Sequence, residues 1–125
     1  MKKQRPTHLN LLKIKLPISG VVSILHRLSG VLLFLALPFI LNSFQLSLVS
    51  ENGFNNTFNT NNYGVLLKLF IIVVLWAGIL HLMAGIRFLL LDAHWGISLS
   101  RSRFSARLIM FLSALSAFAV GGWLW

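Results

Sequence analysis

One apolar run, residues 69–86, constrains the fold of this chain more than any other stretch. Its eighteen residues carry no formal charge, and His81 is the only ionisable side chain among them. A run of this length is sufficient for a helix that crosses a lipid bilayer. An ionisable group at that depth is costly in free energy, so it normally faces the interior of a helix bundle and has a partner. We therefore expect His81 to face protein or a bound group rather than lipid.

The neighbours of His81 on such a helix are small. At about 100° per residue, four small residues fall within roughly 60° of His81 on the helical wheel. These are Ala77, Gly78, Ala84 and Gly85. The shallow trough that they form admits either the backbone of another helix or the flat face of a macrocycle. Imidazole is a common axial ligand of haem iron, but a histidine that only hydrogen-bonds to a neighbouring helix fits these residues equally well.

The composition is that of a small membrane protein. Of 125 residues, 57% are hydrophobic and 10% are charged, which favours one helical bundle in a bilayer. The net charge of +9 could suggest nucleic acid, but the basic residues flank apolar runs, so we interpret them as a topology signal and expect no nucleic-acid partner. The absence of cysteine excludes disulfides, thiolate haem ligands and iron–sulfur ligation by this chain.

Apolar runs of sufficient length occur three times along the chain. We predict an all-α membrane protein, a single transmembrane anchor domain over residues 1–125 with spans at about 22–49, 65–91 and 105–125. Residues 50–64 contain six asparagines, so we expect this stretch to be an irregular loop. Residues 92–105 are expected to form a short polar connection.

The basic residues also predict the orientation. Six of the eleven lysines and arginines lie in residues 1–27, and four flank the second connection, whereas only Lys68 lies on the other side. By the positive-inside rule, the N-terminus is cytoplasmic and the C-terminus periplasmic. The N-terminal segment resembles neither a removable signal peptide nor a transit peptide, which favours the inner membrane of a bacterium over that of a mitochondrion.

This topology brings several polar side chains together near the inner leaflet. They are Ser23, His26, Arg27, Arg87, Asp92, His94 and Trp95. A hydroxyl, an imidazole and a guanidinium can together hold a carbonyl or an anion where apolar walls limit competition from water. Each also has a simpler explanation. The arginines could extend to lipid headgroups, His26 could be interfacial, Ser23 could bond to its own helix, and Asp92 could pair with an arginine.

Two motifs carry a resemblance to a known family. The segment Ser23-Ile-Leu-His-Arg-Leu-Ser-Gly30 and the segment His81-Leu-Met-Ala-Gly-Ile-Arg87, followed by Asp92, resemble the cytochrome b membrane-anchor subunits of succinate dehydrogenase, respiratory complex II. The similarity extends over nearly the whole chain. It implies three spans within a heteromeric helix bundle.

The resemblance also implies roles for individual residues. His81 would be an axial ligand of haem b, with the second axial ligand supplied by a second small membrane-anchor subunit. His26 and Arg27 would lie near the haem propionates, and Ser23 and Arg27 would line a ubiquinone site. Arg87 and Asp92 would support these sites. Phe88 stands where some relatives have another histidine, which argues against a site that uses that imidazole.

The family performs electron transport within the tricarboxylic acid cycle. Its flavoprotein subunit oxidises succinate, and an iron–sulfur subunit passes the electrons to ubiquinone in the bilayer. By this resemblance the chain is a subunit of succinate:quinone oxidoreductase that has no catalytic residues for the dicarboxylate chemistry itself.

Two alternatives belong to other functional classes. The chain could be a haem-free structural membrane anchor that docks soluble redox subunits on its basic inner face. It could also be a small transporter or channel, but such proteins usually have an acid within the membrane or a repeated half. The two acids of this chain, Glu51 and Asp92, lie at the ends of the spans, so the transporter is the weakest of the three hypotheses.

Overall fold

The structure is a computed structural model that describes residues 16–125; the basic residues among the first fifteen, which contribute to the predicted topology, lie outside this range. The described chain forms α1 (Ile18–Val49), α2 (Glu51–Phe58), a 3₁₀ turn η1 (Thr60–Asn62), α3 (Val65–Asp92) and α4 (Leu99–Leu124). No strand occurs within residues 16–125, and the prediction of an all-α protein is confirmed.

Three of these helices are long and apolar enough to cross a membrane. They contain 32, 28 and 26 residues, so at about 1.5 Å per residue each exceeds the roughly 30 Å thickness of the hydrocarbon layer. The predicted number of spans is therefore confirmed. The helices are longer than the predicted spans, because α1 begins directly after Pro17 and α4 begins at Leu99, within the stretch expected to be a connection.

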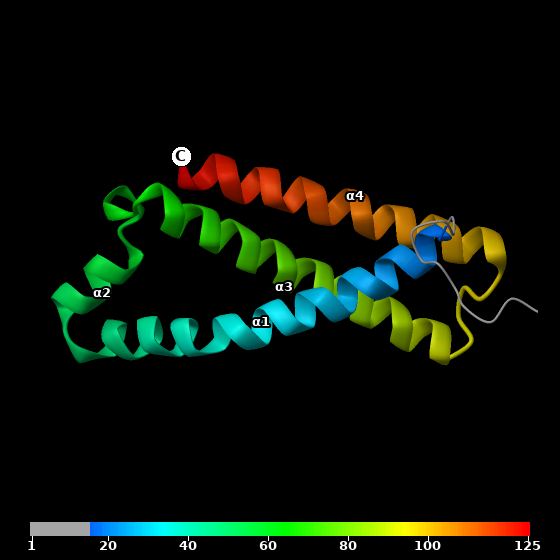
Figure 1. Ribbon diagram of the computed structural model, residues 1–125, viewed down its shortest axis with the longest axis horizontal. Coiled ribbons are helices and arrows are strands. Elements are labelled where there is room, and N and C mark those ends of the chain that lie inside the picture. Colours follow the sequence, from blue (N-terminus) through cyan, green and yellow to red (C-terminus); the bar gives the residue numbers. More distant parts are fainter. Residues whose placement is uncertain (1–15) are drawn as a thin grey trace, which may run out of the picture.

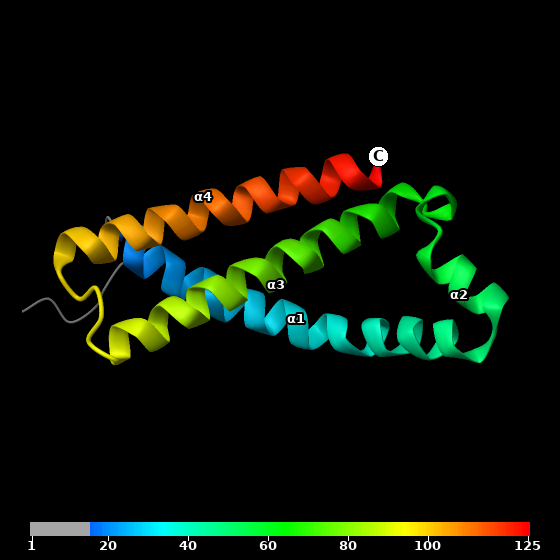
Figure 2. The same ribbon diagram turned by 180° about the vertical axis from the view of Figure 1, so that it is seen from behind.

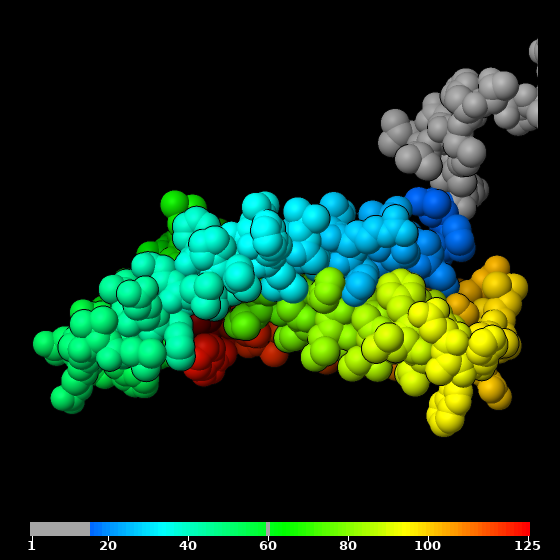
Figure 3. All heavy atoms as spheres, turned by 90° about the horizontal axis from the view of Figure 1, so that it is seen from below, coloured from blue at the N-terminus to red at the C-terminus, as the bar shows by residue number. Residues whose placement is uncertain are grey.

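Helix α3 occupies the centre of the arrangement. It packs against α1 on one side and α4 on the other, while the N-terminal part of α1 also reaches α4 (Figure 1). The view from behind shows the same crossing of α1 over α3 (Figure 2). Seen from below, α1 and the C-terminal half of α3 lie side by side along one face (Figure 3). The N-terminal parts of α1 and α4 and the C-terminal half of α3 therefore meet in one region.

Small side chains let these helices approach closely. The buried cluster at the meeting point consists of Val22, Ala84 and Ala106, one residue from each long helix. Alanine at such contacts allows the backbones to come close together. Most large apolar side chains remain exposed in the single chain, including Leu66 at 84% and Phe118 at 80%. Lipid or other protein chains must therefore cover most of its surface.

The prediction of an irregular loop over residues 50–64 is wrong for its first half, which forms α2. Ser50 caps this helix, since its Oγ accepts a hydrogen bond from the Gly53 N–H at 3.0 Å. The rings of Phe54 and Phe58 contact each other one turn apart, with centroids separated by 4.7 Å. A Cβ at Gly53 would collide with the carbonyl of Leu46, so the missing side chain lets α2 pack tightly on the end of α1.

Candidate functional site

His81 lies on the face of α3 that packs against α1. Its Nδ1 lies 3.0 Å from the backbone carbonyl oxygen of His26 and 3.1 Å from Ser29 Oγ. A carbonyl oxygen can only accept, so this contact places the ring proton on Nδ1 and the free lone pair on Nε2. This arrangement is typical of metal-binding histidines, which usually donate their other ring N–H to a carbonyl or carboxylate.

The Nε2 atom of His81 is not sealed in the protein core. Within residues 16–125 the only buried side-chain nitrogen or oxygen atom without a partner is Nη1 of Arg87, and both hydrogen bonds of the His81 ring to this part of the chain use Nδ1. Its Nε2 therefore remains free to bind a group from outside the chain. No cluster of three or more metal-binding side chains occurs in residues 16–125, so the histidine could supply one ligand but not a complete metal site.

His26 and His81 form a stacked pair of rings, which we call the imidazole pair. Their centroids are 4.1 Å apart and their planes differ by 17°. Two histidines that bind opposite sides of one haem iron direct their nitrogen atoms at each other, whereas these rings lie face to face. The pair therefore cannot supply both axial ligands to one haem, and the second ligand would have to come from another chain.

The small residues around His81 divide into two groups. Ala77 and Ala84 are fully buried, so this part of the trough packs against neighbouring helices of the same chain. Gly78 and Gly85 are only partly buried. Both glycines also face side chains of α1, because a Cβ built on Gly78 would lie 3.9 Å from Leu33 and one built on Gly85 would lie 3.4 Å from His26.

The remaining predicted site residues lie toward the start of α1 and the end of α3. On α1, Ser23 is half-buried and Arg27 is exposed. The half-buried His26 contacts the ring of Phe88 edge-on, with centroids 5.4 Å apart, as well as stacking on His81. Asp92 is exposed at the last position of α3. The structure thus brings His26 directly to His81 and leaves Arg27 and Asp92 at the surface of the chain.

Arg87 is 95% buried, since only 5% of its surface is exposed. Its Nε donates to Ser105 Oγ at 3.0 Å, and its Nη2 donates to Ser19 Oγ at 3.2 Å and to Ser102 Oγ at 3.0 Å. We call Arg87 with these three residues the serine–arginine staple. It connects α3 to α1 and α4, so Arg87 does not extend to lipid headgroups as a terminal arginine usually does.

Several of these contacts were not foreseen in the sequence. The sequence alone indicates no role for Ser29 or for the serines of the staple, although Ser29 belongs to the motif shared with the family. The signal in the sequence is the occurrence of serine near the start of two apolar helices, where each hydroxyl must find a partner.

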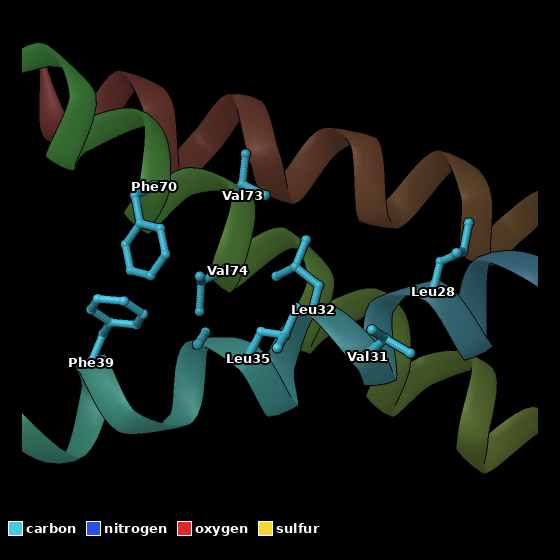
Figure 4. A pocket seen from close by; sticks show the side chains of 9 residues that line it. Leu28, Val31, Leu32, Leu35, Phe39, Phe70, Val73 and Val74 are labelled. Atoms are coloured by element: carbon cyan, nitrogen blue, oxygen red, sulfur yellow. The ribbon is translucent and has the colours of Figure 1, made fainter.

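An apolar groove lies between α1 and α3, on the side of His81 toward the start of α3 (Figure 4). Its volume is about 400 Å³. Phe39 and Phe70 face each other across one end, with ring centroids 5.9 Å apart. The other lining residues are Leu28, Val31, Leu32, Leu35, Ala36, Val73 and Val74. The groove has no polar side chain, so it can hold only a chain or ring of apolar character.

Fold and site together define a three-span membrane protein with a pair of interhelical histidines, of which His81 has no hydrogen bond at Nε2 within residues 16–125. Comparison with known proteins identifies the family. Residues 1–121 match the family described as "Succinate dehydrogenase/Fumarate reductase transmembrane subunit", and the chain belongs to it. The family predicted from the two motifs is therefore confirmed.

Individual relatives support this assignment. The chain is 31% identical to the succinate dehydrogenase cytochrome b556 subunit of Coxiella burnetii over 125 residues, which is the full length of both chains. The protein of the same name from Rickettsia felis is 35% identical over 96 residues, covering 77% of this chain and 73% of that one. The Rickettsia bellii protein of that name is 32% identical over 112 residues, covering 90% of this chain and 86% of that one. The predicted location, as a multi-pass protein of a bacterial inner membrane, is confirmed by these relatives and the three apolar helices.

Proposed function

We propose that this chain is the cytochrome b anchor of a succinate:quinone oxidoreductase and that His81 is an axial ligand of its haem b. The observation that carries the proposal is the hydrogen bond from Nδ1 of His81 to the carbonyl of His26. It holds the proton on the nitrogen that faces α1 and leaves the lone pair of Nε2 for iron. Membership of the family implies further subunits, of which a second membrane-anchor subunit would supply the other axial ligand.

Haem bound at this place would accept or buffer electrons during transfer to quinone. The residues of the chain hold and shield such a group. Gly30 leaves room for the His81 ring on the α1 side, and the stacked ring of His26 fixes its plane. Apolar side chains of α1 and α3 limit the access of water to this depth, which strengthens electrostatic interactions with the ligand.

Ser23 and Arg27 would bind ubiquinone at the inner boundary of the membrane. Both lie on α1 four residues apart, so they share one face of the helix. When quinone takes up two electrons and two protons, negative charge develops on its oxygen atoms. The guanidinium of Arg27 and the hydroxyl of Ser23 would stabilise that charge, by the same electrostatic principle as an oxyanion hole. Flavoprotein and iron–sulfur subunits would deliver the electrons from succinate.

The proposal is tested by the reduced-minus-oxidised spectrum of the assembled complex, for the wild type and for His81→Ala. We expect a b-type spectrum in the wild type and a lost or altered one in the variant. His94→Asn is the matched control, because His94 is exposed beyond the end of α3 and its φ of 63° is one that asparagine tolerates. A wild-type complex without haem would overturn the proposal in favour of a structural anchor. An unchanged spectrum in His81→Ala would overturn the role of His81.

A further inference from the structure

Ser29 is a buried polar residue at the contact of α1 and α3, with 4% of its surface exposed. Its Oγ lies 2.8 Å from the backbone carbonyl oxygen of His26 and 3.1 Å from Nδ1 of His81. The hydroxyl has one proton and two lone pairs. Because the carbonyl can only accept, that proton points to His26 O and a lone pair of Ser29 faces the N–H of His81.

Three donors lie around the carbonyl oxygen of His26, more than its two lone pairs can accept. It accepts the Ser29 hydroxyl and lies 3.0 Å from His81 Nδ1. By the regular pattern of an α-helix it also accepts the N–H of Gly30 within α1. A carbonyl oxygen has only two lone pairs. A second acceptor for the His81 proton is therefore needed, and Ser29 Oγ is the atom that the structure places there.

We propose that Ser29 is a positioning residue for the haem ligand, because it fixes the tautomer and the rotation of the His81 ring. In this way it would adjust the reduction potential of the haem iron. This inference rests on the proposed function. An acceptor at Nδ1–H makes an imidazole a stronger electron donor, and it holds the ring in one orientation. A stronger donor stabilises ferric over ferrous iron and lowers the reduction potential. Loss of the hydroxyl should therefore raise the potential and loosen the ring.

A simpler role for Ser29 would be a bond to its own helix alone. Ser47 provides the comparison, because it lies on the same helix, is 7% exposed and donates from its Oγ to the carbonyl of Phe44 at 2.6 Å. Within residues 16–125 the side chain of Ser47 makes only that bond, whereas Ser29 also reaches His81 on α3. If Ser29 served only α1, removing either hydroxyl would have the same effect on the haem.

The test compares Ser29→Ala, Ser29→Thr and Ser47→Ala in the assembled complex. Three quantities are measured: haem per complex, the midpoint potential of the haem, and the electron paramagnetic resonance spectrum of ferric haem, which reports ligand orientation. For Ser29→Ala we expect haem affinity to fall by about tenfold, the potential to rise and the resonance spectrum to change. Ser29→Thr keeps a hydroxyl and should restore the wild-type haem content, potential and resonance spectrum. Ser47→Ala should have the wild-type value of all three.

The outcomes separate this inference from the proposed function. A Ser29→Ala complex with the potential and resonance spectrum of the wild type would overturn the role of Ser29 alone, as would equal shifts in Ser47→Ala. A wild-type complex without haem would overturn both proposals. If Ser29→Ala fails to assemble, Ser29→Cys keeps nearly the same size but bonds weakly, and it should show the same rise in potential.

Discussion

The rings of His26 and His81 stack at 4.1 Å across the contact between α1 and α3, and each ring also packs against a glycine of the opposite helix. A Cβ built on Gly30 would lie 3.0 Å from Cε1 of His81, and one built on Gly85 would lie 3.4 Å from Nε2 of His26. The two histidines and two glycines thus form a reciprocal contact. The position of the proposed haem ligand depends on how closely α1 and α3 approach.

Gly30→Ala should disturb this contact directly. At 3.0 Å the new methyl group is too close to the His81 ring, and the ring is also held by two hydrogen bonds at Nδ1. We expect it to be displaced, with a clear loss of haem or a changed haem spectrum in the assembled complex. Gly85→Ala should have a weaker effect, since 3.4 Å requires only a small adjustment.

Gly122→Ala is the control for these substitutions, because a Cβ at that position in α4 meets nothing within 4 Å. It makes the same chemical change in a helix and should even favour helix formation slightly. A normal haem spectrum in Gly30→Ala, or an equal loss in Gly122→Ala, would show that the reciprocal contact does not position His81.

Arg87→Lys should destabilise the chain although it preserves the charge. Lysine has a single charged nitrogen and cannot bond three serines on two neighbouring helices as the guanidinium does. We expect a loss of about 2–3 kcal/mol, since each hydrogen bond to a charged group is worth about 1.5–3 kcal/mol. The measurement is the thermal unfolding midpoint of the purified complex.

Exposed Arg107 provides the control for this prediction. Arg107→Lys should change the midpoint little, because surface substitutions usually stay within about 0.5 kcal/mol. Ser105→Ala removes one hydrogen bond of the serine–arginine staple. Its unfolding midpoint should lie between those of Arg87→Lys and Arg107→Lys. Equal midpoints for Arg87→Lys and Arg107→Lys would mean that the staple does not stabilise the bundle.

The number of spans was predictable because each long helix has its own uncharged apolar run. Helix ends were harder to predict. Residues 99–105 are rich in serine and arginine, which suggests a connection, yet they form the first turns of α4, where Ser102 and Ser105 bind Arg87. Helix α2 was missed because its asparagines suggest a loop, while its stability depends on the Ser50 cap and on packing against α1.

The environment of His81 was only partly predictable for a related reason. Periodicity along α3 predicts which small residues share its face, since that depends on one helix alone. It does not predict which residues of α1 lie opposite, because this depends on the crossing and register of two helices. Ser29 and Gly30 could therefore be assigned to the contact only from the three-dimensional arrangement.

Arg27→Ala should impair quinone reduction far more than it lowers haem content. Arg27 is exposed on α1, one residue after His26, and nothing in its position suggests that it supports the bundle. If it stabilises charge on the quinone, its loss should reduce succinate:quinone activity by about 100-fold or more, as for the loss of an oxyanion-hole donor. The checks are quinone reductase activity and haem per complex in the same preparation. Near-normal activity in a fully assembled mutant complex would contradict the proposed quinone site.

The orientation of the chain in the membrane can be tested independently of its redox function. Lys68 Nζ lies 5.1 Å from the centre of the Trp125 ring, so the start of α3 and the end of α4 lie on the same side, opposite the connection that precedes Arg101. By the positive-inside rule, we expect that connection to be cytoplasmic and Trp125 to be periplasmic. Alkaline phosphatase, which is active only in the periplasm, should therefore be active when fused after Trp125 and inactive when fused after Ser98. A fluorescent protein that folds only in the cytoplasm should give the reverse pattern. Phosphatase activity from the Ser98 fusion would show that the topology is the opposite of the expected one. Ser23 and Arg27 would then lie on the side away from the cytoplasm.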